Sequence, residues 1–277
     1  MIGFDTLGII GRLGNQMFQY AALQGIAKHK GYQFMIPDHS MYHEYGGYNY
    51  HELQHCFKLH NLKHLGYIVG RGSRDKEYNV GSNQYRFKEE FFNACPDNHT
   101  IIGYFETEKY FLNAKKEVLD DYEFKDQIQE TCKQYLRSLS IDKPVSLTVR
   151  RGDFLTQQNH RPICTLAYYK DGMSRIGIDR NYLIFSDDIQ WCKEQSLFNK
   201  SNITFAETIN YPIHKSYFDL CLISLCSDHI IANSTFCFWG SYLSKNENKR
   251  IIAPRNWFGP ALPHDTKDLY CDTWEVI

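Results

Sequence analysis

The chain has 277 residues, of which 43% are hydrophobic, enough for one large α/β domain or for two domains of ordinary size. Because the 31 basic residues nearly balance the 32 acidic ones, no bulk electric field draws the chain to nucleic acid or to an anionic membrane. Any anionic ligand must therefore be bound by a local pocket.

Cysteine usage and the N-terminus indicate the compartment. The nine cysteines form no CxxC pair and lie partly in apolar stretches, as buried reduced thiols do. The N-terminal stretch MIGFDTLGII has no basic segment and contains Asp5, so it resembles a strand more than a signal peptide. No uncharged apolar stretch is long enough to span a bilayer. We expect a cytoplasmic protein and leave open a peripheral attachment to the inner membrane.

The first half of the chain has mixed patterns. The elements expected there are a strand at 4–10, a helix at 16–28, a strand-and-loop region at 84–112 and a charged helix at 113–138. A stretch rich in Tyr and His at 42–60 could supply rings for sugar faces or simply pack beneath loops. Asp142-Lys143-Pro144 then breaks the pattern. We place the domain boundary there, between an N-terminal lobe over 1–140 and a C-terminal lobe over 141–277.

The second half alternates short apolar strands with helices, which is typical of a parallel sheet covered on both faces. The predicted strands are 145–149, 182–185, 203–205, 229–232 and 250–253. The predicted helices are 166–175, 189–197, 214–226 and 235–244.

Polar or glycine-rich residues follow four predicted strands, where open parallel sheets bind their ligands. They are Gly11-Arg12-Leu13-Gly14-Asn15-Gln16, Arg150-Arg151-Gly152-Asp153, Ser186-Asp187-Asp188 and Asn233-Ser234-Thr235. Paired arginines bind phosphate through bidentate hydrogen bonds and stay charged in any pocket. A helix start with free N–H groups also favours an anion. Together the four sets predict a site that holds a diphosphate without a metal.

Each set also has a structural alternative. The arginine pair could form an ion pair with Asp153, and the two later sets could simply cap helices. The glycine turn matches neither the dinucleotide fingerprint nor the P-loop. The tripeptide at 151–153 also spells a cell-adhesion motif, which works on an exposed loop of a secreted protein. Asp187-Asp188 lacks the spacing of the Asp-x-Asp metal motif. The shared position at strand ends favours a ligand site.

The stretch HELQH at 51–55 has the spacing of a zinc protease motif. On a helix its two imidazoles would share one face, and Glu52 could act as general base. No Gly stands three residues after His55, where the sequence has Lys58, and the glycines before the motif make a poor helix start. A zinc peptidase remains a minor alternative.

Several stretches resemble the α-1,2-fucosyltransferases of glycosyltransferase family 11. They are GRLGNQMFQYA (11–21), VRRGDF (149–154), FSDD (185–188) and SLCSDHIIANSTFCFWGSYLS (224–244). The resemblance implies a GT-B fold, with two Rossmann-like lobes facing a cleft. It also implies inverting, metal-independent transfer of fucose from GDP-fucose to the 2-hydroxyl of a terminal β-galactoside. The acceptor would be an oligosaccharide or a lipid-linked glycan such as O-antigen. Fucosyl transfer with another linkage and a non-catalytic glycan-binding module are the alternatives.

By position, the resemblance makes Arg150 the main pyrophosphate ligand and Asp187 the residue that reads the guanine edge. The expected donor-binding set is Arg12, Gly14, Asn15, Gln16, Arg150, Arg151, Asp187, Asp188, Asn233, Ser234, Thr235 and Phe236. Because adjacent strand residues point to opposite faces, Arg150 and Arg151 are not expected to do the same job. Asp153 is the candidate general base, or else the residue that orients the arginines.

One position departs from the family pattern, and the family pattern explains the HELQH stretch. Thr148 stands where the family commonly has His, two residues before the arginine pair, so an imidazole contact near the nucleoside is expected to be missing. At HELQH the family has an apolar pattern, which Leu53 and Phe57 match.

Overall fold

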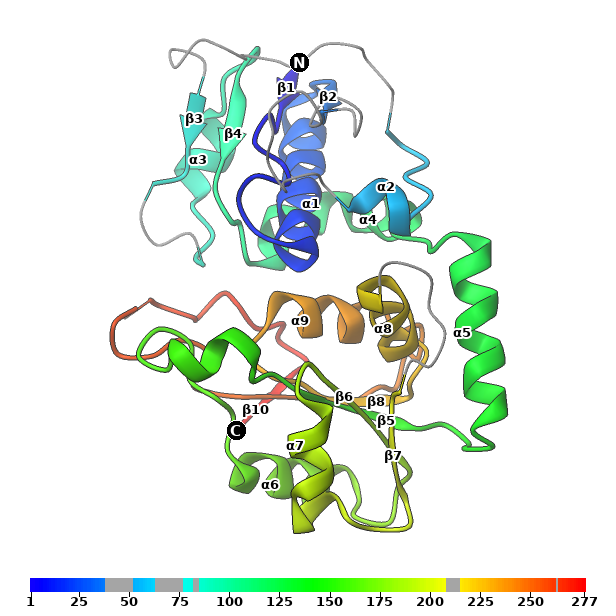
Figure 1. The fold of residues 1–277 in the computed structure, drawn as a ribbon. Helices are drawn as coiled ribbons and strands as arrows, with labels where there is room; N and C mark the ends of the chain where they lie inside the picture. Colours follow the sequence, from blue (N-terminus) through cyan, green and yellow to red (C-terminus); the bar gives the residue numbers. More distant parts are fainter. Residues whose placement is uncertain (38–51, 63–76, 82–84, 208–214, 263) are drawn as a thin grey trace. The chain divides into compact units, whose positions relative to one another are not determined.

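The structure is a computed structural model that describes residues 1–37, 52–62, 77–81, 85–207, 215–262 and 264–277 (Figure 1). The chain forms two compact units. Unit 1 comprises Met1–Lys125 and Asp265–Cys271, and unit 2 comprises Asp126–His264 and Asp272–Ile277. Each unit has its own parallel sheet.

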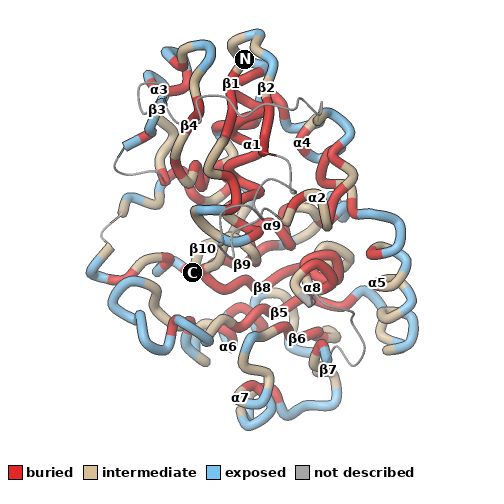
Figure 2. Tube along the Cα trace, turned by 45° about the horizontal axis from the view of Figure 1, so that its top comes forward, coloured by how far each residue is buried: buried red, intermediate tan, exposed pale blue. Residues whose placement is uncertain are grey.

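The unit 1 sheet has the strand order β2-β1-β4-β3. Its strands are β1 (Ile2–Gly3), β2 (Phe34–Met35), β3 (Glu77–Asn79) and β4 (Thr100–Ile102). The helical elements described in this unit are α1 (Leu13–Lys30), α2 (Leu53–Cys56), α3 (Glu89–Ala94), η3 (Glu108–Tyr110), η4 (Leu112–Ala114) and α4 (Lys115–Asp121). Helix α1 is buried along most of its length (Figure 2). A Cβ on Gly25 would lie 1.9 Å from the Tyr110 carbonyl oxygen, so only glycine lets η3 approach α1 this closely.

The predicted strand at 4–10 is wrong. The sheet strand ends at Gly3, and residues 5–9 form turns in which Leu7 and Ile9 donate to the Phe4 and Thr6 carbonyls. Gly8 and Gly11 adopt φ values of 88° and 90°, which an extended strand does not allow.

The unit 2 sheet is parallel throughout, in the order β10-β9-β8-β5-β6-β7. Its strands are β5 (Val145–Val149), β6 (Tyr182–Ser186), β7 (Ile203–Phe205), β8 (Asp228–Ile230), β9 (Ile251–Ala253) and β10 (Glu275–Val276). The helical elements described here are α5 (Asp126–Ser138), η5 (Gly152–Thr156), α6 (Leu166–Ile176), α7 (Ile189–Glu194), η6 (Ser196–Phe198), α8 (Lys215–Ser224) and α9 (Thr235–Tyr242). Figure 1 shows α8 and α9 on one face of the sheet and α6 and α7 on the other. The predicted covered parallel sheet is confirmed.

The units separate in sequence at Lys125, earlier than the expected boundary near residue 140. The reason is that α5 packs against α8 and so belongs to unit 2. The segment Asp265–Cys271 returns to unit 1, where Asp268 accepts hydrogen bonds from Arg86 Nε at 2.8 Å and Lys109 Nζ at 2.6 Å.

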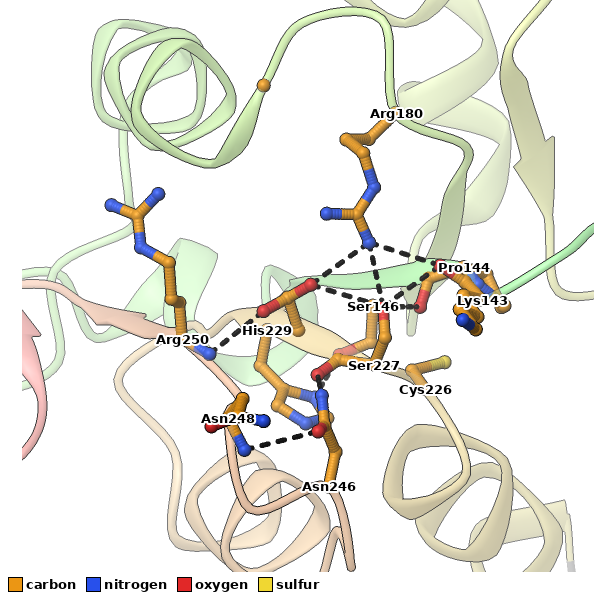
Figure 3. A network of polar contacts seen from close by, with 12 residues as sticks. Lys143, Pro144, Ser146, Arg180, Cys226, Ser227, His229, Asn246, Asn248 and Arg250 are labelled. Carbon is orange, nitrogen blue, oxygen red and sulfur yellow. Dashed lines mark hydrogen bonds and ion pairs between the residues drawn. The ribbon is translucent and has the colours of Figure 1, made fainter.

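A polar network lies at the amino end of the unit 2 sheet (Figure 3). Arg180 Nη2 donates to the Lys143 carbonyl at 3.3 Å, to Ser227 Oγ at 2.9 Å and to Asp228 Oδ2 at 3.0 Å. Next to it, the buried Ser146 and His229 side chains form a hydrogen bond of 2.7 Å. These contacts fix the starts of β5 and β8.

All nine cysteines are free and buried, as expected. Among the helices that the structure describes, none combines the length and the apolar character needed to cross a bilayer.

Candidate functional site

The arginine and aspartate motifs meet at the carboxyl edge of the unit 2 sheet. Val149 and Ser186 are register partners at the ends of β5 and β6, so the residues that follow them are neighbours. The structure therefore brings together Arg150, Arg151, Asp153, Asp187 and Asp188.

Arg150 lies between two carboxylates. Its Nη1 donates to Asp187 and its Nη2 to Asp153, and its guanidinium carbon lies 5.3 Å from the centroid of the Phe154 ring. The Arg150 side chain keeps an exposed fraction of 25%, and that of Asp153 is 47% exposed. The cation is thus held in a defined place but remains open to solvent at the sheet edge.

Arg151 follows the end of β5 and has partners different from those of Arg150. Its Nε donates to Asp188 Oδ2 at 2.9 Å, and its guanidinium stacks on the Trp191 ring. Asp188 also caps α7, because its Oδ1 accepts from the backbone N–H of Trp191 at 3.3 Å. The capping alternative for Asp188 is therefore correct, and the same carboxylate binds an arginine.

Asp187 is enclosed by three consecutive residues. Its Oδ2 accepts from Arg150, its Oδ1 accepts from the Arg151 N–H at 2.9 Å, and a Cβ on Gly152 would lie 2.4 Å from Oδ2. Gly152 is thus required by the close approach of this carboxylate. In this geometry Asp187 is a counter-ion of Arg150 and accepts from the Arg151 backbone N–H, and its contact with guanine stays a prediction.

The buried side chain of Asn233 ties loops together. Its Nδ2 donates to the Pro162 carbonyl at 2.9 Å and to the Trp257 carbonyl at 3.0 Å, and its Oδ1 faces the Cys164 thiol at 3.6 Å. Burial raises the pKa of Cys164 to about 12, so this thiol remains a neutral donor. Asn233 therefore shapes the edge through two loops.

The start of α9 is the open end of an otherwise buried helix. Ser234 is the N-cap, with φ −140° and ψ 134°, and its side chain makes no capping hydrogen bond. Ser234, Thr235 and Phe236 are half-buried, whereas the residues from Cys237 to Tyr242 are buried. The accessible part of the helix is therefore its positive end.

The N-terminal set gathers at the start of α1 in unit 1. Arg12 is the exposed N-cap, Gly14 is buried, and Asn15 lies so close to Gly11 that a Cβ there would be 2.5 Å from it. Gln16 is buried, and its amide is satisfied there: its Nε2 donates to the Gly11 carbonyl at 3.2 Å and its Oε1 accepts from the Glu52 N–H at 2.7 Å. Gln16 thus holds the glycine turn. Its contact with the sugar-nucleotide donor stays a prediction.

Comparison with known proteins identifies the family. The family model described as "Glycosyl transferase family 11" matches residues 51–277. The chain belongs to glycosyltransferase family 11. Proteins similar to this chain include the alpha-1,2-colitosyltransferase of Escherichia coli, 26% identical over 90% of this chain and 91% of the relative. Another is the O-antigen biosynthesis glycosyltransferase WbnK of Escherichia coli, 24% identical over 95% of this chain and 97% of the relative. A third is galactoside alpha-(1,2)-fucosyltransferase 2 of Bos taurus, 24% identical over 88% of this chain and 70% of the relative.

Solved structures agree on the fold. Fucosyltransferase NodZ from Bradyrhizobium superposes with a TM-score of 0.52 at 11% identity, covering 87% of this chain and 92% of that one. POFUT1 in complex with GDP-fucose superposes with a TM-score of 0.50 at 12% identity, covering 89% and 93%. This family 11 glycosyltransferase has a fold of the GT-B type.

Within this family 11 chain, Thr148 has a structural role. Its buried Oγ1 accepts from the Ala232 N–H at 2.9 Å and donates to the Ile230 carbonyl at 3.5 Å. Its hydroxyl therefore joins β5 to the end of β8, inside the sheet.

The described residues in and just after HELQH contribute to the unit 1 core through two apolar side chains. His51 lies outside the described residues, Glu52 precedes the single-turn helix α2, and Leu53 and Phe57 are buried. Burial of these two side chains agrees with a packing role for the apolar pattern. Among the described residues, no group of three or more His, Cys, Asp or Glu could hold a metal ion.

Trp191, which stacks on Arg151, lies outside the sequence motifs that predicted the site. Its signal in the sequence is an aromatic residue in the first turn of the helix that follows FSDD.

Proposed function

We propose that this protein is an inverting, metal-independent α-1,2-fucosyltransferase. It moves fucose from GDP-fucose to the 2-hydroxyl of a terminal β-galactoside, carried on a free oligosaccharide or on a lipid-linked glycan such as O-antigen. The observation that carries the proposal is Arg150, held at the carboxyl edge of a parallel sheet by Asp153 and Asp187. Membership of family 11 and relatives named as galactoside α-1,2-fucosyltransferases support the reaction.

The proposed chemistry follows from charge. Departure of GDP leaves negative charge on the β-phosphate, and a guanidinium aimed at that oxygen stabilises the transition state more than the ground state. A phosphate oxygen can replace either carboxylate as a partner of Arg150. The accessible start of α9 would add N–H donors and a favourable dipole.

Asp153 has two possible roles in this reaction. It can accept the proton of the attacking hydroxyl, or it can orient the Arg150 guanidinium. The ion pair between Asp153 and Arg150 favours the orienting role.

The test is transfer by the purified protein with GDP-fucose, EDTA and either lactose or a Galβ1,3 acceptor. We expect a fucosylated product whose linkage and anomeric configuration NMR identifies as α-1,2. Release of GDP without product across a broad acceptor panel would overturn the proposal. A different linkage, or loss of transfer in EDTA, would overturn the corresponding part.

A second candidate concerns the donor sugar alone. The 26% identical relative is named an alpha-1,2-colitosyltransferase, so nucleotide-activated colitose is the alternative donor. Competition between the two donors in one reaction, followed by mass spectrometry of the product, ranks them by kcat/KM. We expect fucose to be preferred.

A further inference from the structure

A stacked pair lies beside Arg150 on the same sheet edge. The Arg151 guanidinium carbon is 3.9 Å from the centroid of the Trp191 ring, which is a cation–π arrangement. The Nε of Arg151 donates to Asp188 Oδ2 at 2.9 Å. The Arg151 side chain is 15% exposed, compared with 25% for Arg150, so its charge is the more shielded of the two.

The turn between β6 and α7 places the indole ring. The Asp188 N–H donates to Ser186 Oγ at 2.9 Å, and Asp188 Oδ1 accepts from the Trp191 N–H at 3.3 Å. Asp188 thus caps α7 with one oxygen and binds Arg151 with the other. The ring and the carboxylate together restrict Arg151 to one orientation among the many that a long side chain samples.

This arrangement leaves one edge of the Arg151 guanidinium for a ligand. The group is planar, so a ring on its face and a carboxylate on Nε leave the two η nitrogens. Within the described part of the chain, these nitrogens donate no hydrogen bond to another residue. The Arg151 backbone N–H donates to Asp187 Oδ1 at 2.9 Å, and Asp187 Oδ2 accepts from the Arg150 guanidinium. One carboxylate therefore fixes the backbone of Arg151 beside the arginine that we assign to the diphosphate.

We propose that Trp191 is a positioning residue of the donor site, and that it holds Arg151 so that the η nitrogens bind the nucleotide diphosphate. The inference rests on the proposed function, because the ligand is the nucleotide part of the donor. A guanidinium that is already ordered loses less rotamer freedom on binding, so the effect falls on affinity. The competing explanation is that the stack only fastens α7 to the end of β5, in which case Trp191 affects stability alone.

The experiment compares Trp191→Phe and Trp191→Leu in the full chain. The readouts are the Kd for GDP by calorimetry, KM for GDP-fucose, kcat and Tm. Phe keeps an aromatic face, so we expect it to stay within about 3-fold of the wild type. Leu removes that face, and we expect it to raise Kd and KM roughly 5- to 30-fold with a smaller change in kcat.

Phe205→Leu is the matched control, because Phe205 lies 6.0 Å from Lys193 Nζ, a cation on the same helix α7. We expect Phe205→Leu to change Tm without changing Kd or KM. If Trp191 acts through Arg151, then Trp191→Leu made in an Arg151→Lys background should have less than about a 2-fold further effect.

The outcomes separate the two proposals. GDP binding by the wild type tests the donor, and its absence overturns both proposals. Wild-type Kd and KM in a folded Trp191→Leu protein overturn the positioning role alone. The positioning role is also overturned if Trp191→Leu raises Kd and KM by the same factor in the wild type and in Arg151→Lys. Trp191 would then act independently of Arg151.

Discussion

The two ends of the unit 2 sheet place arginine beside aspartate in different ways. At the amino end, Arg180 donates to the Lys143 carbonyl as well as to Asp228, and Asp228 Oδ1 accepts from the Arg250 N–H at 2.9 Å (Figure 3). At the carboxyl end, both partners of Arg150 are side-chain carboxylates.

The difference lies in what an anionic ligand can replace. A phosphate can take the place of a side-chain carboxylate, which then turns into solvent. It cannot take the place of a backbone carbonyl or N–H group, because these belong to the fold. The amino end is therefore a structural network, and the carboxyl end is suited to exchange one anion for another.

Arg150→Ala is expected to have the largest effect. Loss of one transition-state contact of this kind typically lowers kcat about 10²- to 10³-fold. Arg150→Lys should recover little, because an ammonium group cannot make the bidentate contact. The measurement is kcat with GDP-fucose, with Tm as the check on folding. A folded Arg150→Ala protein with near-normal turnover would remove Arg150 from the mechanism.

Asp228→Asn tests the amino end, where the effect should fall on stability. The Asp228 side chain is 10% exposed and accepts from both Arg180 and a backbone N–H, so its neutralisation should cost about 1–3 kcal/mol. All four tryptophans lie in unit 2, so fluorescence during urea unfolding reports on this unit. The turnover of the folded protein should be unchanged.

The control for this change is Asp171→Asn, which removes the exposed ion pair with Arg175. Exposed pairs of this kind contribute about 0–1 kcal/mol. Equal stability losses in the two variants would contradict the distinction between a structural network and a surface pair. Loss of turnover in folded Asp228→Asn would contradict the distinction between the two ends.

The sequence indicated the unit 2 strands well, for a physical reason. A strand buried on both faces is rich in apolar residues, so β5 and β6 can be recognised from their composition. The two polar residues of β5, Ser146 and Thr148, are buried with hydrogen-bond partners. The residues after β5 and β6 must then lie at one edge. The two-residue strand β10 at the edge has too little pattern to be recognised.

What the sequence could not indicate depends on packing between distant segments. The stack of Arg151 on Trp191 and the choice of Asp188 as its partner result from the geometry of the β6–α7 turn. The roles of Gln16 and Asn233 were obscured for a related reason. An amide that holds a loop and an amide that binds a ligand look the same in sequence, and burial distinguishes them.

Asp153→Asn sharpens the interpretation of the carboxyl end. The amide keeps the shape of the side chain but loses the charge that pairs with Arg150. If Asp153 orients the guanidinium, transfer and GDP affinity should fall together, each roughly 10-fold. The measurements are kcat/KM and the Kd for GDP in the same preparation. Lost transfer with intact GDP affinity would instead identify Asp153 as the general base.

The smallest expected effect concerns pH and His229, at the amino end. This side chain is fully buried, and its Nε2 has no hydrogen-bond partner among the described residues. Burial lowers the pKa of His229 to about 3, and the nearby Lys249 ammonium acts in the same direction. The folded protein therefore keeps His229 neutral, whereas the unfolded chain takes up a proton near pH 6.5.

Stability must then fall as the pH drops below 6.5, because the unfolded state binds the extra proton. The loss attributable to His229 should be about 1 kcal/mol between pH 7.5 and pH 6.0. Urea unfolding of the wild type and of His229→Leu at both pH values, followed by tryptophan fluorescence, measures it. The variant loses the hydrogen bond to Ser146 at both pH values, so only the difference between them reports the titration. Equal pH dependence in the two proteins would mean that the pKa of His229 is the same in the folded and unfolded chains.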